Sequence, residues 1–222
     1  MLYLDSANID DLKRAKELGV VEGTTTNPTI LKKENVAQED IIHDVLSLTT
    51  GHVYVQTEGT STEEILSDAQ RLLNLFPDER IALKIPAHLA GIAAIKRMKE
   101  KRADVNILAT AIYSSDQGLL AALAGSDMIA PYINRMANNN IDPYKVIAET
   151  ATLYEEKQLK TRILGASFKN TDQVIRTLVS GAHAVTVPFE IIEQMANKGL
   201  ALAAIDVFNE DARLLRESSG EK

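Results

Sequence analysis

A single lysine lies where the sequence otherwise predicts a buried strand. Lys84 stands inside the run IALKIP, residues 81–86, among aliphatic side chains. An ammonium group is costly to bury without a partner, so lysine is rarely found inside a core. Burial also lowers the pKa of an amine, and a neutral amine attacks a ketone to form a Schiff base. Lys84 is therefore a candidate nucleophile, although a snorkelling or ion-paired lysine explains the position equally well when it is read alone.

A protonated Schiff base draws electrons from the neighbouring carbon, where it stabilises a carbanion equivalent as an enamine. Carbon–carbon bonds can form or break at that carbon without a metal ion. The same reaction needs groups that carry protons for water loss and for the substrate alcohol. The sequence has candidates for proton transfer and for substrate binding near the ends of its apolar runs. They are Asp5, Thr25, Asn27, Gln56, Thr110, Tyr132, Arg135, Ser167 and Lys169.

Four of these residues suit proton transfer. Asp5 is a candidate acid/base at the substrate alcohol. Tyr132, Gln56 and Thr110 could hold a water molecule between them. Each of the four also has a structural explanation when it is read alone, because aspartate favours helix caps, a buried amide can be satisfied by the backbone, threonine favours strands and tyrosine is more often a core residue.

The other five suit substrate binding. Asn27 offers an amide to sugar hydroxyls, and Thr25 lies two residues before it in the run GTTTN. The dipeptide Asn-Pro at this point is also a common turn signal, so a turn role alone stays open. Arg135 and Ser167, the latter close to the start of a predicted helix, could bind a phosphate. Lys169 could add to this positive field or simply face solvent.

Short apolar runs alternate with amphipathic segments along the whole chain, which predicts strands alternating with helices. The predicted strands are 2–5, 23–27, 52–58, 81–86, 104–113, 128–134, 162–167 and 184–188. The predicted helices are 8–18, one that follows 27 and ends near 48, one that begins at 61, 89–101, 114–125, 142–157, 172–180, one that ends near 198, and a last one at about 200–216. Two helix starts carry capping-box patterns, Ser61 with Glu64 and Ser114 with Gln117.

Eight strand–helix units without a linker predict one (β/α)8 TIM barrel domain over residues 1–222, with an additional C-terminal helix. An open, doubly wound sheet is the alternative. Active sites of such barrels lie at the C-terminal ends of the strands. The barrel therefore brings Lys84 and the other candidates to one cleft, and this shared location is the main argument that they act together.

Composition limits the classes of function. The formal net charge is −7 and the pI about 5.2, with no basic stripe, which argues against nucleic acid as a partner. The chain has no cysteine, so thiolate ligands and cysteine nucleophiles are excluded. The four histidines are scattered and no nucleotide-binding loop is present, so we expect no metal and no cofactor. Without a signal-peptide or membrane-spanning pattern, a cytoplasmic protein that does not bind membranes is expected.

The runs LYLDSANI, GTTTNPTI, ALKIP, LATAIYSSDQGLLAALAG, APYINR, LGASFKN and AVTVPFEII occur in this order along the chain. Together they resemble the blocks of the small transaldolase family, which includes the fructose-6-phosphate aldolases, over nearly the whole length. The resemblance implies a (β/α)8 barrel with Lys84 as the Schiff-base lysine and Asp5 as acid/base. It also implies that Asn27 binds the donor and that Arg135 and Ser167 bind phosphate.

The family divides into two activities. Transaldolases move a dihydroxyacetone unit between sugar phosphates of the pentose phosphate pathway, whereas fructose-6-phosphate aldolases release or take up free dihydroxyacetone. Gln56 and Tyr132 resemble the aldolase group, since transaldolases typically carry glutamate and phenylalanine there. Glu58, predicted on the same side of the strand as Gln56, blurs this distinction. We expect aldolase activity first and transaldolase activity second.

Two further expectations follow from the resemblance. Members commonly form pentamers stacked into decamers, so the C-terminal helix at about 200–216 is expected to pack on a neighbouring subunit. A third functional alternative is a non-catalytic barrel that binds sugar phosphates, in which Lys84 would form a structural ion pair.

Overall fold

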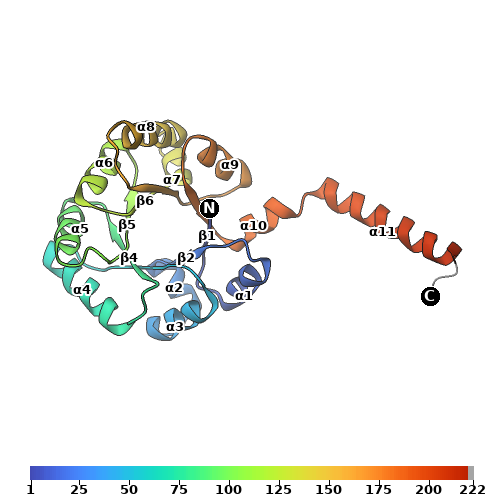
Figure 1. The fold of residues 1–222 in the computed structure, drawn as a ribbon, viewed down its shortest axis with the longest axis horizontal. Coiled ribbons are helices and arrows are strands. Elements are labelled where there is room, and N and C mark those ends of the chain that lie inside the picture. The colour runs from blue at the N-terminus through green and yellow to red at the C-terminus, as the bar shows by residue number, and fades with distance from the viewer. Residues whose placement is uncertain (220–222) are drawn as a thin grey trace.

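Eight parallel strands close into a barrel in chain order, so the (β/α)8 prediction is confirmed and the open sheet is excluded (Figure 1). The computed structural model describes residues 1–219, and the last three residues of the predicted domain lie outside them. The barrel closes where β1 pairs with β8, with Tyr3 opposite Thr186. The strands are β1 (Leu2–Asp5), β2 (Gly23–Thr25), β3 (Val53–Gln56), β4 (Ile81–Pro86), β5 (Ile107–Ile112), β6 (Met128–Pro131), β7 (Arg162–Gly165) and β8 (Ala184–Val187).

Helices surround the barrel, except for the last helix of the described residues, which extends away from it (Figure 1). Those of residues 1–219 are α1 (Ile9–Leu18), α2 (Pro28–Glu34), α3 (Gln38–Leu48), α4 (Thr62–Leu75), α5 (Leu89–Lys101), α6 (Ser115–Ala124), α7 (Ile133–Asn138), α8 (Pro143–Glu156), α9 (Thr171–Val179), α10 (Phe189–Ala196) and α11 (Gly199–Ser219). No helix in this range is both long enough and apolar enough to cross a membrane.

The alternation of side chains along β4 explains how a lysine enters this core. Leu83 and Ile85 belong to the large cluster between the strands and the helices. Ala82 belongs to a second cluster, inside the barrel, which also contains Tyr54 and Leu108. Successive strand residues point to opposite faces, so the side chain of Lys84 also points into the barrel, above this inner cluster and toward the C-terminal ends of the strands.

Several predicted helix ends are confirmed. Gly19 ends α1 in the left-handed conformation, and Gly125 does the same for α6. Ser61 and Glu64 form the expected capping box, in which the Ser61 hydroxyl accepts from the Glu64 N–H and the Glu64 carboxylate accepts from the Ser61 N–H. Asp142 caps α8, which begins with proline as predicted.

Other local predictions are wrong. The single helix expected to end near 48 is two helices, because Asn35 takes a left-handed conformation, φ 52°, and ends α2. The strand expected over 128–134 ends at Pro131, and a short helix, α7, follows it. Ser114 and Gln117 form no capping box. The Gln117 Oε1 accepts from the Tyr113 N–H instead, and its Nε2 donates to the carbonyl of Ala87.

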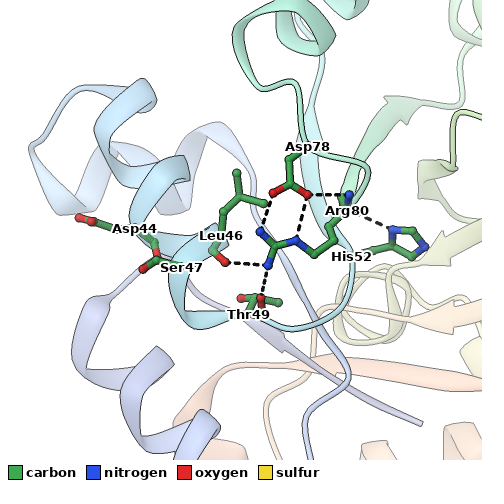
Figure 2. A network of polar contacts seen from close by, with 7 residues as sticks. All are labelled: Asp44, Leu46, Ser47, Thr49, His52, Asp78 and Arg80. Atoms are coloured by element: carbon green, nitrogen blue, oxygen red, sulfur yellow. Dashed lines mark hydrogen bonds and ion pairs between the residues drawn. The ribbon is translucent and has the colours of Figure 1, made fainter.

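A polar network ties elements together before the first residues of β3 and β4, at the end of the barrel away from Lys84 (Figure 2). The Arg80 Nη1 donates to the carbonyls of Leu46 (2.9 Å) and Thr49 (2.7 Å), which end α3. The same guanidinium forms two further bonds to Asp78 and holds the pKa of that carboxyl at about 2. One side chain therefore joins the C-terminus of α3 to the start of β4.

The C-terminal helix leaves the barrel. Figure 1 shows α11 extending from α10 away from the other elements. Nearly all of its described side chains are exposed, including large apolar ones such as Leu200, Ile205 and Phe208. The predicted helix at about 200–216 is thus present, and it presents an apolar surface to its surroundings.

Candidate active site

Lys84 is buried, with 4% of its side chain exposed. Its Nζ donates to the carbonyl of Thr26, 3.1 Å away. Burial lowers the pKa of Lys84, the nearby Asp5 carboxyl opposes this shift, and the Arg135 cation adds to it. A lowered pKa raises the fraction of neutral amine, which is the form that attacks a carbonyl.

Asp5 ends β1 and belongs to a chain of hydroxyl groups. The Thr25 Oγ1 donates to Asp5 Oδ1 at 2.7 Å, and the Thr186 Oγ1 lies 2.7 Å from the Thr25 Oγ1. Because Thr25 has one hydroxyl proton and gives it to Asp5, Thr186 donates to Thr25. Burial raises the pKa of Asp5, while Lys84 and the bond from Thr25 lower it. These opposing effects suit a group that must both give and take a proton.

Tyr132 and Thr110 meet on the neighbouring side of the barrel. Their hydroxyl oxygens lie 3.0 Å apart. The Tyr132 ring packs edge-on against Tyr113, and burial raises the pKa of the Tyr132 phenol. The pairing of β5 with β6 changes register between Ala109 and Ile112 of β5. Ala111, between these two residues, takes a left-handed conformation, φ 59°.

Arg135 and Ser167 mark the outer part of the site. Arg135, predicted just after the sixth strand, is exposed on α7, and its guanidinium lies 5.0 Å from the centre of the Tyr132 ring. Ser167 follows β7 with φ 63°, a left-handed conformation that costs about 1–3 kcal/mol in a non-glycine residue. Strain of this kind is typical of ligand-binding positions.

One cavity of about 520 Å³ joins these groups at the C-terminal ends of the strands. Of the predicted site residues, its lining includes Asp5, Thr25, Asn27, Gln56, Lys84, Tyr132, Arg135 and Ser167. The floor is formed by small or apolar side chains, among them Leu108, Ala130 and Ala166. The volume lies within the range of small-molecule sites, about 300–1,000 Å³, and is large enough for a sugar phosphate.

The remaining candidates lie differently. Thr110 contributes through its bond to Tyr132. Lys169 is exposed outside the lining, and its backbone N–H donates to Gln173. Glu58, expected beside Gln56 on the strand, follows the end of β3 and is exposed, so it does not blur the character of Gln56.

Asn27 has both of the roles that the sequence left open. Its Oδ1 accepts from the Ile30 N–H and caps α2, and the residue also lines the cavity.

Thr186 was missed by the sequence reasoning. Its position in the run AVTVP, two residues before a proline and at the C-terminal end of the last predicted strand, was the available signal. The described residues contain no group of three or more His, Asp or Glu that could hold a metal ion, and the expectation that none is used stays a prediction.

Comparison with known proteins decides the family. Residues 2–219 match the transaldolase/fructose-6-phosphate aldolase family. The chain belongs to this family. It is 39% identical to a "Probable fructose-6-phosphate aldolase" of Streptococcus pneumoniae, over 97% of each chain. It is also 35% identical to a "Probable transaldolase 2" of Bacillus anthracis, over 94% of this chain and 96% of that protein.

The transaldolase/fructose-6-phosphate aldolase family consists of enzymes under both names, so the alternative of a non-catalytic barrel falls away. The two relatives carry different names, and the family therefore gives the type of enzyme without choosing between the activities. A mutant flavocytochrome b2 solved with benzoylformate is similar in structure, with a TM-score of 0.60 and 14% identity over 85% of this chain and 57% of that one. At this identity the similarity concerns the fold alone.

Proposed function

We propose that the chain is a metal-independent aldolase that makes or cleaves fructose 6-phosphate through a Schiff base on Lys84. In the synthetic direction, the neutral amine attacks the carbonyl carbon of dihydroxyacetone, and loss of water gives an iminium ion. Loss of a proton from the adjacent carbon gives an enamine. The enamine carbon then bonds to the aldehyde carbon of glyceraldehyde 3-phosphate, which restores the iminium ion. Water hydrolyses this ion and releases fructose 6-phosphate and the free amine of Lys84, and the new alkoxide takes a proton.

Asp5 is the proposed donor of that proton, and it takes the proton back in the cleavage direction. The raised pKa of its carboxyl and the supporting bond from Thr25 suit this task. Asn27 would bind a donor hydroxyl through its Nδ2, since its Oδ1 is used in capping α2. Arg135 and Ser167, which both line the cavity, would bind the phosphate of the acceptor through the charge of the guanidinium and the hydroxyl of the serine.

The observation that favours the aldolase over the transaldolase is the pair of hydroxyls on Tyr132 and Thr110. Gln56 lies on β3 directly opposite Lys84 and lines the same cavity. Together these groups can orient a water molecule toward the iminium carbon and release free dihydroxyacetone. A phenylalanine in place of Tyr132 would have no hydroxyl to orient this water. The dihydroxyacetone adduct would then persist until an acceptor aldehyde arrives.

The deciding experiment mixes the pure protein with free dihydroxyacetone and glyceraldehyde 3-phosphate in the presence of a chelator. Formation of fructose 6-phosphate is the expected result. No product here, together with turnover of fructose 6-phosphate and erythrose 4-phosphate, would overturn the aldolase assignment in favour of the transaldolase. The second candidate keeps support from the name of the Bacillus anthracis relative.

We also propose that residues 1–222 form one domain that assembles into a pentamer or decamer through α11. The support is the exposed apolar surface of this helix, which a monomer would leave in water. Leu200 is 91% exposed and Phe208 is 66% exposed, which is unusual for such side chains along one helix.

A further inference from the structure

The loop that follows β7 is held in place by a side chain outside the cavity. Gln173 lies in the first turn of α9 and is only partly exposed. Its Oε1 accepts from the Lys169 N–H at 2.8 Å, and its Nε2 donates to Asn134 Oδ1 at 3.2 Å. One amide group therefore joins the loop to α7, which is the helix that carries Arg135.

The orientation of these amides follows from their partners. A backbone N–H can only donate, so the atom of Gln173 that faces Lys169 is the oxygen. The nitrogen of Gln173 then faces Asn134, which must present its own oxygen. The bonds form a single directed chain, in which the loop donates to Gln173 and Gln173 donates to Asn134 on α7.

The same loop is joined to α7 by the backbone. The Asn134 N–H donates to the carbonyl of Ser167 at 2.8 Å, and the Ile133 N–H donates to the carbonyl of Ala166 at 2.8 Å. Ser167 keeps its left-handed conformation between these bonds and the bond from Lys169 to Gln173. A strained conformation persists only where the surroundings hold it, so the loop needs a restraint on both sides of Ser167.

We infer that Gln173 and Asn134 are positioning residues for the phosphate of the acceptor substrate. This inference rests on the proposed function, in which Arg135 and Ser167 bind that phosphate. Gln173 adds a side-chain link to the two backbone bonds between the loop and α7, and so restrains the position of Ser167 relative to Arg135. Loss of the amide would loosen the anion site while leaving Lys84 and Asp5 unchanged.

The test compares two acceptors in Gln173→Met. With glyceraldehyde 3-phosphate we expect KM to rise about three- to tenfold, the effect of losing one or two hydrogen bonds, with kcat nearly unchanged. With unphosphorylated glyceraldehyde, both constants should stay at the wild-type values. An equal loss with both acceptors, or no loss with either, would overturn the inference.

Gln70→Met is the matched control. Gln70 also donates to an asparagine, Asn74, at 2.8 Å, but on the exposed surface of α4. This variant loses the same kind of bond and should bind both acceptors as the wild type does. Asn134→Leu should reproduce the effect of Gln173→Met, and the double variant should be little worse than either single one, because both residues act through one chain of bonds.

A binding measurement keeps the inference separate from the proposed reaction. Glycerol 3-phosphate resembles the acceptor but has no aldehyde, so its affinity can be measured by calorimetry without turnover. We expect weaker binding to Gln173→Met and unchanged binding to Gln70→Met. If the wild type makes no fructose 6-phosphate but this difference is found, the aldolase proposal fails and the positioning role stands. Equal affinity in all three proteins would overturn the positioning role whatever the reaction is.

Discussion

The burial of Lys84 lowers the stability of the fold but favours the proposed chemistry. Its burial costs folding free energy, because the amine loses its hydration, and the same burial lowers its pKa. Lys84→Met should therefore abolish turnover and at the same time raise the free energy of unfolding by about 1–2 kcal/mol at pH 7. Borohydride reduction with dihydroxyacetone, read by mass spectrometry, should label the wild type and leave the variant unlabelled.

The pH dependence of the stability gained in Lys84→Met follows from the direction of the pKa shift of Lys84. The folded-state pKa of Lys84 lies below the unfolded value, so between the two the unfolded chain holds one more proton and stability rises with pH. The advantage of Lys84→Met should thus be largest at the acidic end of the pH range and shrink as pH rises toward the unfolded pKa, about 10.4. Lys157→Met, at an exposed position, should show no such trend in urea unfolding. A pH-independent advantage would contradict this account.

Tyr132→Phe tests the role of the phenol. The variant loses the hydroxyl that lies 3.0 Å from the Thr110 oxygen and keeps the ring against Tyr113. Release of free dihydroxyacetone should fall by roughly a hundredfold, the usual contribution of a positioned acid or base. Formation of the reducible adduct should change little.

Tyr113→Phe is the control for that experiment, because it removes a hydroxyl from the neighbouring ring of the same edge-on pair. Release should stay at the wild-type rate in this variant. Equal losses of adduct formation and release in Tyr132→Phe would show that the phenol acts before hydrolysis.

Most of the candidate site residues could be predicted from the sequence, because each of them departs from the apolar pattern of the strand around it. A lysine in an apolar strand and polar residues at strand ends are visible without coordinates. Thr186 was not, since a threonine in a strand is ordinary and its bond to Thr25 depends on the closure of the barrel. Gln173 was equally hidden, because its partner Asn134 is 39 residues away.

At the scale of elements, Arg80 holds the end of α3 against the start of β4 (Figure 2). Arg80→Met should lower the free energy of unfolding by about 2 kcal/mol, because two carbonyls lose a charged donor and Asp78 loses its partner. Activity per folded molecule should be unchanged, since the network lies at the far end of the barrel. Urea unfolding and steady-state kinetics measure the two quantities.

Arg102→Met is the comparison for Arg80→Met. Arg102 pairs with Asp104 on the surface, where the Arg102 side chain is 48% exposed and the Asp104 side chain 67% exposed. Such pairs contribute little, so the change should stay within about 0.5 kcal/mol. Equal effects of the two substitutions would mean that the carbonyl contacts of Arg80 do not stabilise α3.

Element boundaries were predictable where a strong stop signal exists. Gly19, Gly125 and the Asp142–Pro143 pair mark helix ends by their chemistry, and the structure confirms them. The break at Asn35 has neither glycine nor proline, so the apolar pattern continued across it. The helix α7 was missed because the apolar run MIAPYI continues past Pro131, where the strand ends.

At the scale of the molecule, the exposed apolar side chains of α11 predict that copies of the chain assemble into an oligomer. Phe208→Asp should lower the mass measured by sedimentation, because it places a charge on the apolar surface of the helix. Ala203→Asp adds the same charge on the side of the helix that carries Asp206 and Glu210, and should leave the mass unchanged. A wild-type chain that sediments as a monomer would contradict the proposed assembly.

The closing pair of strands has a consequence for synthesis. β1 emerges from the ribosome first, yet it pairs with β8, whose residues lie more than 180 positions later. Until then Asp5 and Thr25 lack Thr186, and the barrel around Lys84 stays open to water. A nascent chain thus carries a hydrated, protonated lysine that does not react with the ketones of the cell. Lys84 is buried, and so becomes a reactive nucleophile, only when the polypeptide is almost complete.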